Sequence, residues 1–224
     1  MRGEPFTGLL LAPRDGDARK AHARITEFSC VSKMRQVDPQ GWHEAEYASP
    51  IALLGEDEFG DRRPPFVYPL LCRFGISRFL LLSRARNVVE QLVGSVWTGG
   101  SAPVAVKIGV DALVRDLAQK PGRYVLSYVH ARVSAFGTSL EAASFYGEDV
   151  AEALFFREGL GLFNCNSCGL RRAAGGPEIV RLSNAGGVSL RHLGTPRLRE
   201  IDELFTYLRK EGYVPTTQVV ETDR

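Results

Sequence analysis

Long apolar runs are absent from this sequence of 224 residues. Among the longest is Phe79-Leu80-Leu81-Leu82, whereas a membrane-spanning helix needs about 18 to 20 apolar residues. Leu9-Leu10-Leu11-Ala12 is shorter than the roughly 7 to 15 apolar residues of a secretory signal, and Pro13 follows it at once. Hydrophobic residues still make up 44% of the chain, enough for a globular core. We therefore expect a cytoplasmic protein that makes no membrane contact.

Recognisable catalytic signatures are also missing. No glycine-rich phosphate loop is present, and the four histidines lie in no metalloprotease or deaminase motif. His43 stands beside Glu44 and Glu46, but the preceding Gly41-Trp42 favours an exposed turn over an acid–base site. The sequence thus favours a protein that is not an enzyme, with a small enzyme whose site forms only in three dimensions as an alternative.

Cysteine is scarce, with four residues in the chain. Such a low count does not indicate a disulfide framework, so free thiols or metal ligands are expected. Cys165 and Cys168 have the spacing of half a zinc knuckle, with Gly169 placed to form its turn. Cys30 and Cys72 are the candidates for the remaining two ligands of a tetrahedral zinc ion, and His130 and His192 are the alternates. The alternatives are a redox pair and two ordinary reduced cysteines in a turn.

Lysine is the rarest charged residue, since 23 of the 28 basic residues are Arg. A GC-rich genome would explain this bias, and so would selection for bidentate recognition of phosphate or carboxylate, which Arg performs better than Lys. The charges are segregated along the chain. Residues 62–132 carry 11 basic and 3 acidic side chains, and residues 159–199 carry 6 and 1. The flanking segments are acidic, so neighbouring segments could also simply neutralise one another.

Hydrophobic periodicity and turn residues predict an α+β fold. We expect a mixed or mostly antiparallel sheet with hairpins, three to four helices packed on it, and an amphipathic helix at the C-terminus. Alternation in residues 123–133 places Val125, Val129, Ala131 and Val133 on one face of a strand. Strands are predicted at 25–31, 47–54, 66–72 and 78–82, hairpins at 123–147 and 178–193, and helices at 85–96, 111–119, 150–156 and 196–211.

The Thr-Gly-Gly-Ser-Ala-Pro stretch at 98–103 is the most linker-like segment of the chain. It separates an N-terminal half, residues 1–97, from a C-terminal half, residues 104–212. The two halves are expected to form one compact unit, with residues 213–224 as a flexible tail.

The Arg-rich segments suggest a basic face that binds a polyanionic partner, most plausibly nucleic acid or an acidic protein surface. Aromatic residues lie among them, although Phe74, Phe79, Tyr124 and Tyr128 are expected to pack in the core. The alternative is an accessory subunit that binds protein partners or a second copy of itself, without affinity for nucleic acid. The candidate nucleic-acid-binding residues are Arg73, Arg78, Arg84, Arg86, Arg171, Arg172, Arg181 and Arg191.

Overall fold

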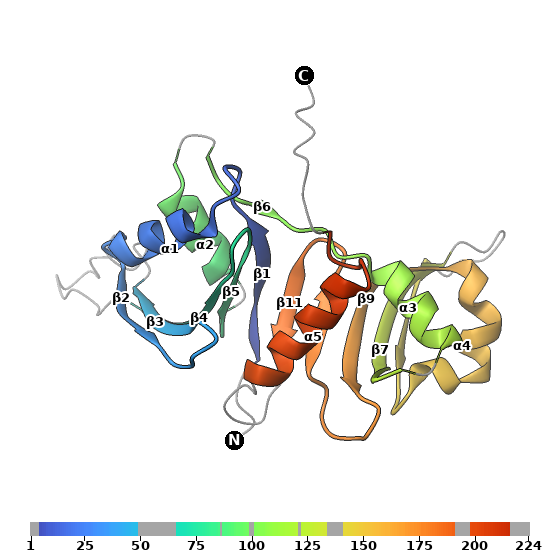
Figure 1. The fold of residues 1–224 in the computed structure, drawn as a ribbon. Helices are drawn as coiled ribbons and strands as arrows, with labels where there is room; N and C mark the ends of the chain where they lie inside the picture. Colours follow the sequence, from blue (N-terminus) through green and yellow to red (C-terminus); the bar gives the residue numbers. More distant parts are fainter. Residues whose placement is uncertain are drawn as a thin grey trace, which may run out of the picture. The chain divides into compact units, whose positions relative to one another are not determined.

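The structure is a computed structural model that describes residues 5–48, 66–85, 87–98, 101–120, 122–133, 141–190 and 198–215. The chain divides into two compact units, which we call the N-unit (Phe6–Ala105) and the C-unit (residues 106–215) (Figure 1). Each unit contains an antiparallel sheet and helices. The predicted combination of helices with a mostly antiparallel sheet built from hairpins is therefore correct.

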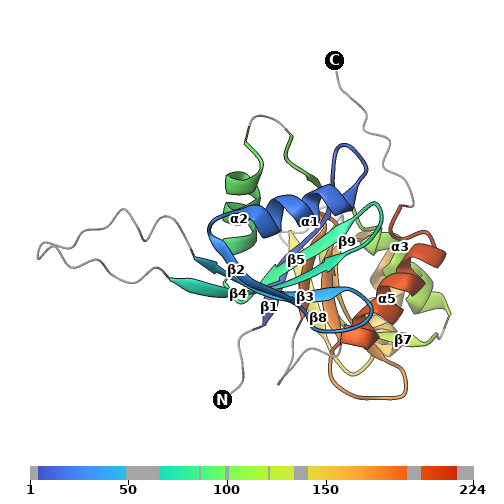
Figure 2. The same ribbon diagram turned by 60° about the vertical axis from the view of Figure 1, so that its left-hand side comes forward.

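The N-unit sheet has the strand order β2-β3-β4-β5-β1, with β6 added alongside β1. Helices α1 and α2 lie together on one side of this sheet (Figure 2). The strands predicted at 66–72 and 78–82 are confirmed and form a hairpin around Gly75, because β4 and β5 pair in a register that ends with Phe74 opposite Phe79. The elements in chain order are β1 (Phe6–Ala12), α1 (Ala18–Glu27), β2 (Val31–Gln36), β3 (Trp42–Ala48), β4 (Val67–Phe74), β5 (Phe79–Ser83), α2 (Val88–Val96) and β6 (Val104–Ala105).

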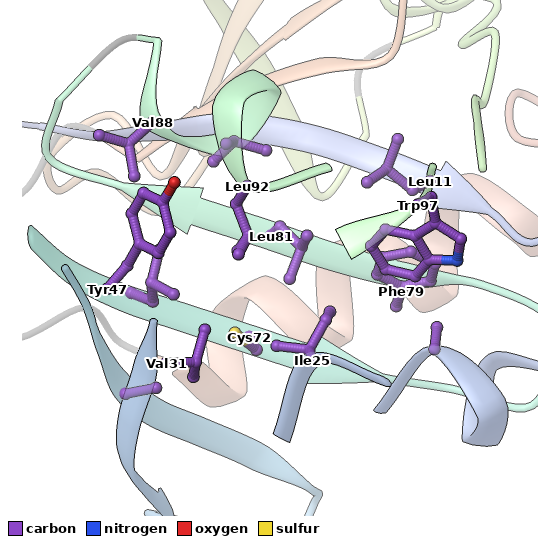
Figure 3. Packing of buried hydrophobic residues seen from close by; sticks show 14 of the residues in the cluster. Leu11, Ile25, Val31, Tyr47, Cys72, Phe79, Leu81, Val88, Leu92 and Trp97 are labelled. Carbon is purple, nitrogen blue, oxygen red and sulfur yellow. The ribbon is translucent and has the colours of Figure 1, made fainter. Parts of the chain in front are cut away.

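The N-unit core forms between the two helices and the sheet (Figure 3). Leu81 of β5 and Cys72 of β4 meet Ile25 of α1 and Leu92 of α2, and all four are buried. Each fully buried aliphatic side chain of this kind contributes about 1.5 to 3 kcal/mol. All five residues of β5 are buried, so this apolar strand is covered on both faces.

The strand predicted at 25–31 is wrong, since residues up to Glu27 belong to helix α1. Asp17 caps this helix by accepting a hydrogen bond from the Arg19 N–H at 2.9 Å. Ala18, Ala21 and Ile25 then fall on its buried side at helical spacing. The cap and this spacing outweigh the β-propensity of a few residues near Ile25.

The C-unit sheet has the order β11-β10-β9-β7-β8, and α3 and α5 lie on one side of it (Figure 1). The predicted hairpin between β10 and β11 is confirmed, with Leu182 opposite Val188 and Gly186 in the left-handed region at φ 80°. The elements in chain order are α3 (Val110–Gln119), β7 (Tyr124–Val133), β8 (Ala142–Tyr146), α4 (Leu154–Gly159), β9 (Phe163–Arg172), β10 (Val180–Ser183), β11 (Gly187–Leu190) and α5 (Leu198–Lys210).

Strand β7 pairs with β8 as predicted, but its two faces are not those predicted from strict alternation. Tyr124 and Leu126 are buried before position 127, and Val129 and Ala131 are buried after it. The buried positions therefore change from even to odd numbers along the strand. The register against β9 shifts between Leu126 and Tyr128, which leaves one extra residue in β7. Such a β-bulge reverses which side chains face inward beyond it.

Five α-helices are found among the described residues, where the sequence predicts three to four, because part of α1 is predicted as a strand. The strand predicted at 47–54 extends beyond the described residues, and its first two residues end β3 instead. The segment predicted to be a flexible tail begins with two buried residues, Tyr213 and Val214. The remainder of that segment, from residue 216, lies outside the described residues.

A polar network attaches α3 to β9. The Asp111 carboxylate accepts the Cys165 backbone N–H at 2.8 Å and the Arg115 guanidinium at 2.7 Å. Arg115 also donates to the carbonyls of Leu160 at 3.1 Å and Phe163 at 2.7 Å. Partial burial alone would raise the Asp111 pKa, but the hydrogen bonds from Arg115 and Cys165 outweigh it and hold that pKa below the ordinary 3.8.

We expect Asp111→Asn to destabilise the protein by about 1 to 2 kcal/mol at pH 7, because the amide cannot replace the charge that Arg115 binds. Since the folded-state pKa of Asp111 lies below its unfolded value, its contribution is complete above about pH 5. The contribution is lost as the pH falls through the folded-state pKa. The stability difference between wild type and Asp111→Asn should therefore shrink on acidification, as measured by urea unfolding at several pH values.

Glu148→Gln is the matched control, since the Glu148 side chain is 96% exposed and its carboxylate lies 3.9 Å from Arg171. This variant should change stability by less than about 0.5 kcal/mol at any pH. A constant difference for Asp111→Asn between pH 7 and acid would show that the carboxylate charge does not carry the network.

Candidate functional site

The candidate site is the face of the C-unit sheet opposite α3 and α5, which we call the open face. Tyr124 and Arg172 point to the helical side, where they contact Tyr207 and Glu203 of α5. The bulge in β7 turns Tyr128 and His130 to the opposite side. The open face includes the following residues of β7, β8, β9 and β10: Ser127, Tyr128, His130, Arg132, Ser144, Tyr146, Ser167, Gly169, Arg171, Arg181 and Ser183.

One cross-strand row of the open face combines two tyrosines with an arginine. Tyr146 of β8 lies opposite Tyr128 of β7, with ring centroids 4.9 Å apart. The Arg181 guanidinium lies 4.1 Å from the Tyr128 ring centroid, which is cation–π geometry. Tyr146 remains 67% exposed. The row therefore offers an aromatic surface, one ring of which is freely accessible, beside a positive charge.

Glycine at position 169 makes room for an acidic side chain on this face. A Cβ atom there would overlap the Glu178 carboxylate oxygen and would lie 3.0 Å from the Ser127 hydroxyl. Glu178 accepts hydrogen bonds from Ser127 at 2.8 Å and from Arg181 at 2.8 Å. The carboxylate thus fixes Arg181 over the Tyr128 ring and balances part of its charge.

The neighbouring row is hydroxyl-rich. Ser144, His130, Ser167 and Ser183 lie side by side across four strands. His130 Nδ1 is 2.8 Å from the Ser144 hydroxyl. Among the described residues, no carboxylate is hydrogen-bonded to His130, so the row lacks the third group that orients a catalytic histidine. The row presents hydrogen-bond donors and acceptors on the open face.

Positive charge lies on both sides of this pair of rows. Arg132 is exposed at the end of β7, opposite Asn164 and Ala142. Arg171 follows Gly169 by two residues on the same side of β9, and its guanidinium donates to the Glu148 carbonyl. The Arg171–Glu148 ion pair spans 3.9 Å and is solvent-exposed on the Glu148 side, so it neutralises little charge.

The predicted arginines are distributed over both units. Arg171 and Arg181 share the open face, whereas Arg172 lies on the helical side and pairs with Glu200 and Glu203 of α5. In the N-unit, Arg73 donates to the Phe74 carbonyl at 2.7 Å, Arg78 precedes β5 and has a partner of its own, and exposed Arg84 lies over the Phe6 ring. Arg86 and Arg191 lie outside the described residues.

The cysteines do not form the predicted turn, because Cys165 and Cys168 both lie within strand β9. Asn166 is an extra residue opposite His130 and Ala131, so both thiols are buried. Burial raises the pKa of Cys165 and of Cys72 to about 12 and raises that of Cys168 as well.

No third ligand for zinc accompanies either cysteine pair in the part of the chain that the structure describes. Cys165 and Cys168 belong to the C-unit, and Cys30 and Cys72 to the N-unit. No group of three or more His, Cys, Asp or Glu residues among the described residues could hold a metal ion. The four-cysteine zinc site stays a prediction without a described geometry.

Tyr146 is the functional candidate that sequence reasoning missed. The sequence predicts that Tyr128, like Phe79 and Tyr124, packs in the core. Phe79 and Tyr124 are buried, but Tyr128 lies on the open face. The available signal was the predicted pairing of residues 123–133 with 139–147, which places two tyrosines near one another. It was not decisive because the bulge at Ser127, invisible in the sequence, decides that Tyr128 faces outward.

The sequence matches no protein-family model, and no curated protein resembles it significantly. None of the described helices has the length and apolar character needed to cross a membrane. The open face must therefore be interpreted from its own chemistry.

We expect Gly169→Ala to destabilise the protein by about 1 to 3 kcal/mol, since the methyl group displaces Glu178 from its bonds to Ser127 and Arg181. Thermal unfolding of this variant should be compared with that of Gly161→Ala. No atom lies within 4 Å of a Cβ at Gly161, so this control should have little effect. Equal stability of Gly169→Ala and wild type would contradict the described packing of Glu178.

Thiol reactivity at pH 8 should separate the four cysteines. Cys30 is partly exposed and the other three are buried. A pKa of about 12 leaves Cys72 and Cys165 with roughly 1,000-fold less thiolate than an ordinary cysteine. A thiol reagent should therefore modify one site quickly in the native protein and four after unfolding, and Cys30→Ser should abolish the fast site. Protection of Cys30 that only a chelator removes would instead support zinc.

Proposed function

We propose that the protein binds single-stranded nucleic acid on the open face of the C-unit. The observation that carries this proposal is the pair of adjacent tyrosines on neighbouring strands with Arg181 stacked on one of them. Bases stack on aromatic rings and on guanidinium planes presented by a sheet, and each stacked base contributes about 1 to 3 kcal/mol. Tyr146 is exposed enough to receive a base directly.

The two Arg-rich segments of the sequence both contribute to this face. Tyr128, His130 and Arg132 come from segment 62–132, and Arg171 and Arg181 come from segment 159–199. Arg132 and Arg171 are placed to contact phosphates on either side of the tyrosine row. The serines and His130 supply hydrogen bonds that suit sugar and base edges without demanding one base.

The Glu178 carboxylate argues for a single-stranded rather than a double-stranded ligand. It balances part of the charge of Arg181 and places a negative charge at the centre of the face. A duplex presents mainly phosphates to a flat surface, so this central negative charge would oppose it. A single strand can turn its bases toward the tyrosines and keep its phosphates at the arginines on the periphery.

Fluorescence anisotropy with a labelled oligothymidylate of about 12 nucleotides tests the proposal. Binding should be measurable at about 50 mM salt and should weaken steeply by about 200 mM. Tyr128→Leu and Tyr146→Leu should each weaken binding by about 5- to 100-fold through lost stacking. Arg132→Gln should lower the slope of log affinity against log salt by about 1.

Phe66→Leu is the matched control, because Phe66 is an aromatic residue of the N-unit that is 63% exposed. This variant should bind as wild type does. Absence of binding at low salt, or equal loss in Phe66→Leu and Tyr146→Leu, would refute the open face as a nucleic-acid site.

A further inference from the structure

Strand β8 is an edge strand whose outer backbone groups lack a partner among the described residues. It pairs with β7 alone in that part of the chain. Gly147 donates its N–H to the Ser127 carbonyl, and Val133 donates to the Glu141 carbonyl. Since antiparallel pairing alternates, Ala143 and Phe145 also bond toward β7, and Ala142, Ser144 and Tyr146 direct their N–H and C=O groups outward.

This edge has none of the features that normally block an exposed strand. The sequence Ala-Ala-Ser-Phe-Tyr contains no charge and no proline, and its pairing with β7 is regular. Strand β2, the first strand of the N-unit sheet, is protected instead. Its register is interrupted between Ser32 and Arg35, Lys33 has φ 54°, and Lys33 forms an ion pair with Glu46. Strand β2 is therefore blocked against further pairing, whereas β8 is available.

We propose that β8 pairs with β8 of a second copy of this chain, antiparallel about a twofold axis at Ser144. In this register the three outward residues of each strand form three pairs that each exchange two hydrogen bonds. Tyr146 lies opposite the partner's Ala142, and Phe145 opposite the partner's Ala143, so large side chains meet small ones. Ser144 faces its own copy, and Glu141 faces Gly147, so no like charges meet within the paired strand.

Apolar surface continues from the edge strand onto helix α4. The Phe155 ring is 72% exposed and lies 6.2 Å from the Phe145 ring on the helical side of β8. Leu154 beside it is 69% exposed. Exposed apolar side chains grouped next to an open strand edge are typical of an interface. A second copy would bring its own α4 to the same edge and cover both groups.

Light scattering coupled to size exclusion, in the absence of nucleic acid, measures the assembly. Wild type should have twice the chain mass of 24.7 kDa at micromolar concentration. Ser144→Lys and Ser144→Glu should each be monomers, because two like charges would meet at the twofold axis. Mixing the two variants should restore a dimer, since opposite charges then meet. This recovery is specific to the proposed register.

Two serine variants serve as controls. Ser144→Ala removes the bond to His130 without adding charge and should remain a dimer. Ser32→Lys adds the same charge to the protected edge strand β2 and should also remain a dimer. A monomeric wild type, an assembly that survives Ser144→Lys, or two monomeric variants that do not recombine would each overturn the proposal. Because no nucleic acid is present, these outcomes do not depend on the open-face proposal.

Discussion

The register between β7 and β9 is the constraint on which the C-unit depends. Two extra residues, Ser127 in β7 and Asn166 in β9, interrupt an otherwise regular ladder. Each one turns the following side chains to the other side of the sheet. Without the first, Val129 and Ala131 would face solvent and Tyr128 would be buried under the helices. The same two insertions thus determine both the composition of the core and the chemistry of the open face.

The centre of the open face is stabilised by paired opposite charges rather than by an excess of positive charge. Gly169 leaves space for the Glu178 carboxylate, which binds Ser127 and Arg181 and keeps the guanidinium over the Tyr128 ring. A fixed guanidinium loses less conformational entropy when a base stacks nearby than a free side chain would. The Glu178 carboxylate also reduces the net positive charge at the centre of the face. Attraction for a polyanion then rests on Arg132 and Arg171 at the periphery.

Much of the fold could be predicted because local signals were strong. The Gly75 and Gly186 turns and the alternation of 123–133 identified three of the hairpins. The sequence prediction does not include helix α1, because it does not use Asp17 as an N-cap. Ile25 and Phe28 are also residue types that are common in strands. The prediction of a turn at the cysteine pair is wrong, because the spacing of the two cysteines is equally compatible with a strand that contains a bulge. Bulges depend on pairing between distant segments, so a local pattern cannot reveal them.

Together, the two proposals determine how far the binding surface extends. A twofold axis perpendicular to the sheet keeps both open faces on the same side of a paired β8 ladder. Tyr146 of each copy would then lie two residues from the axis, and the tyrosine rows of both copies would form parts of one surface. A strand bound across both copies gains from the high effective concentration of the second site. Pairing through β8 would therefore convert two short sites of modest charge into one long site, which is how a face with few free cations could bind a polyanion tightly.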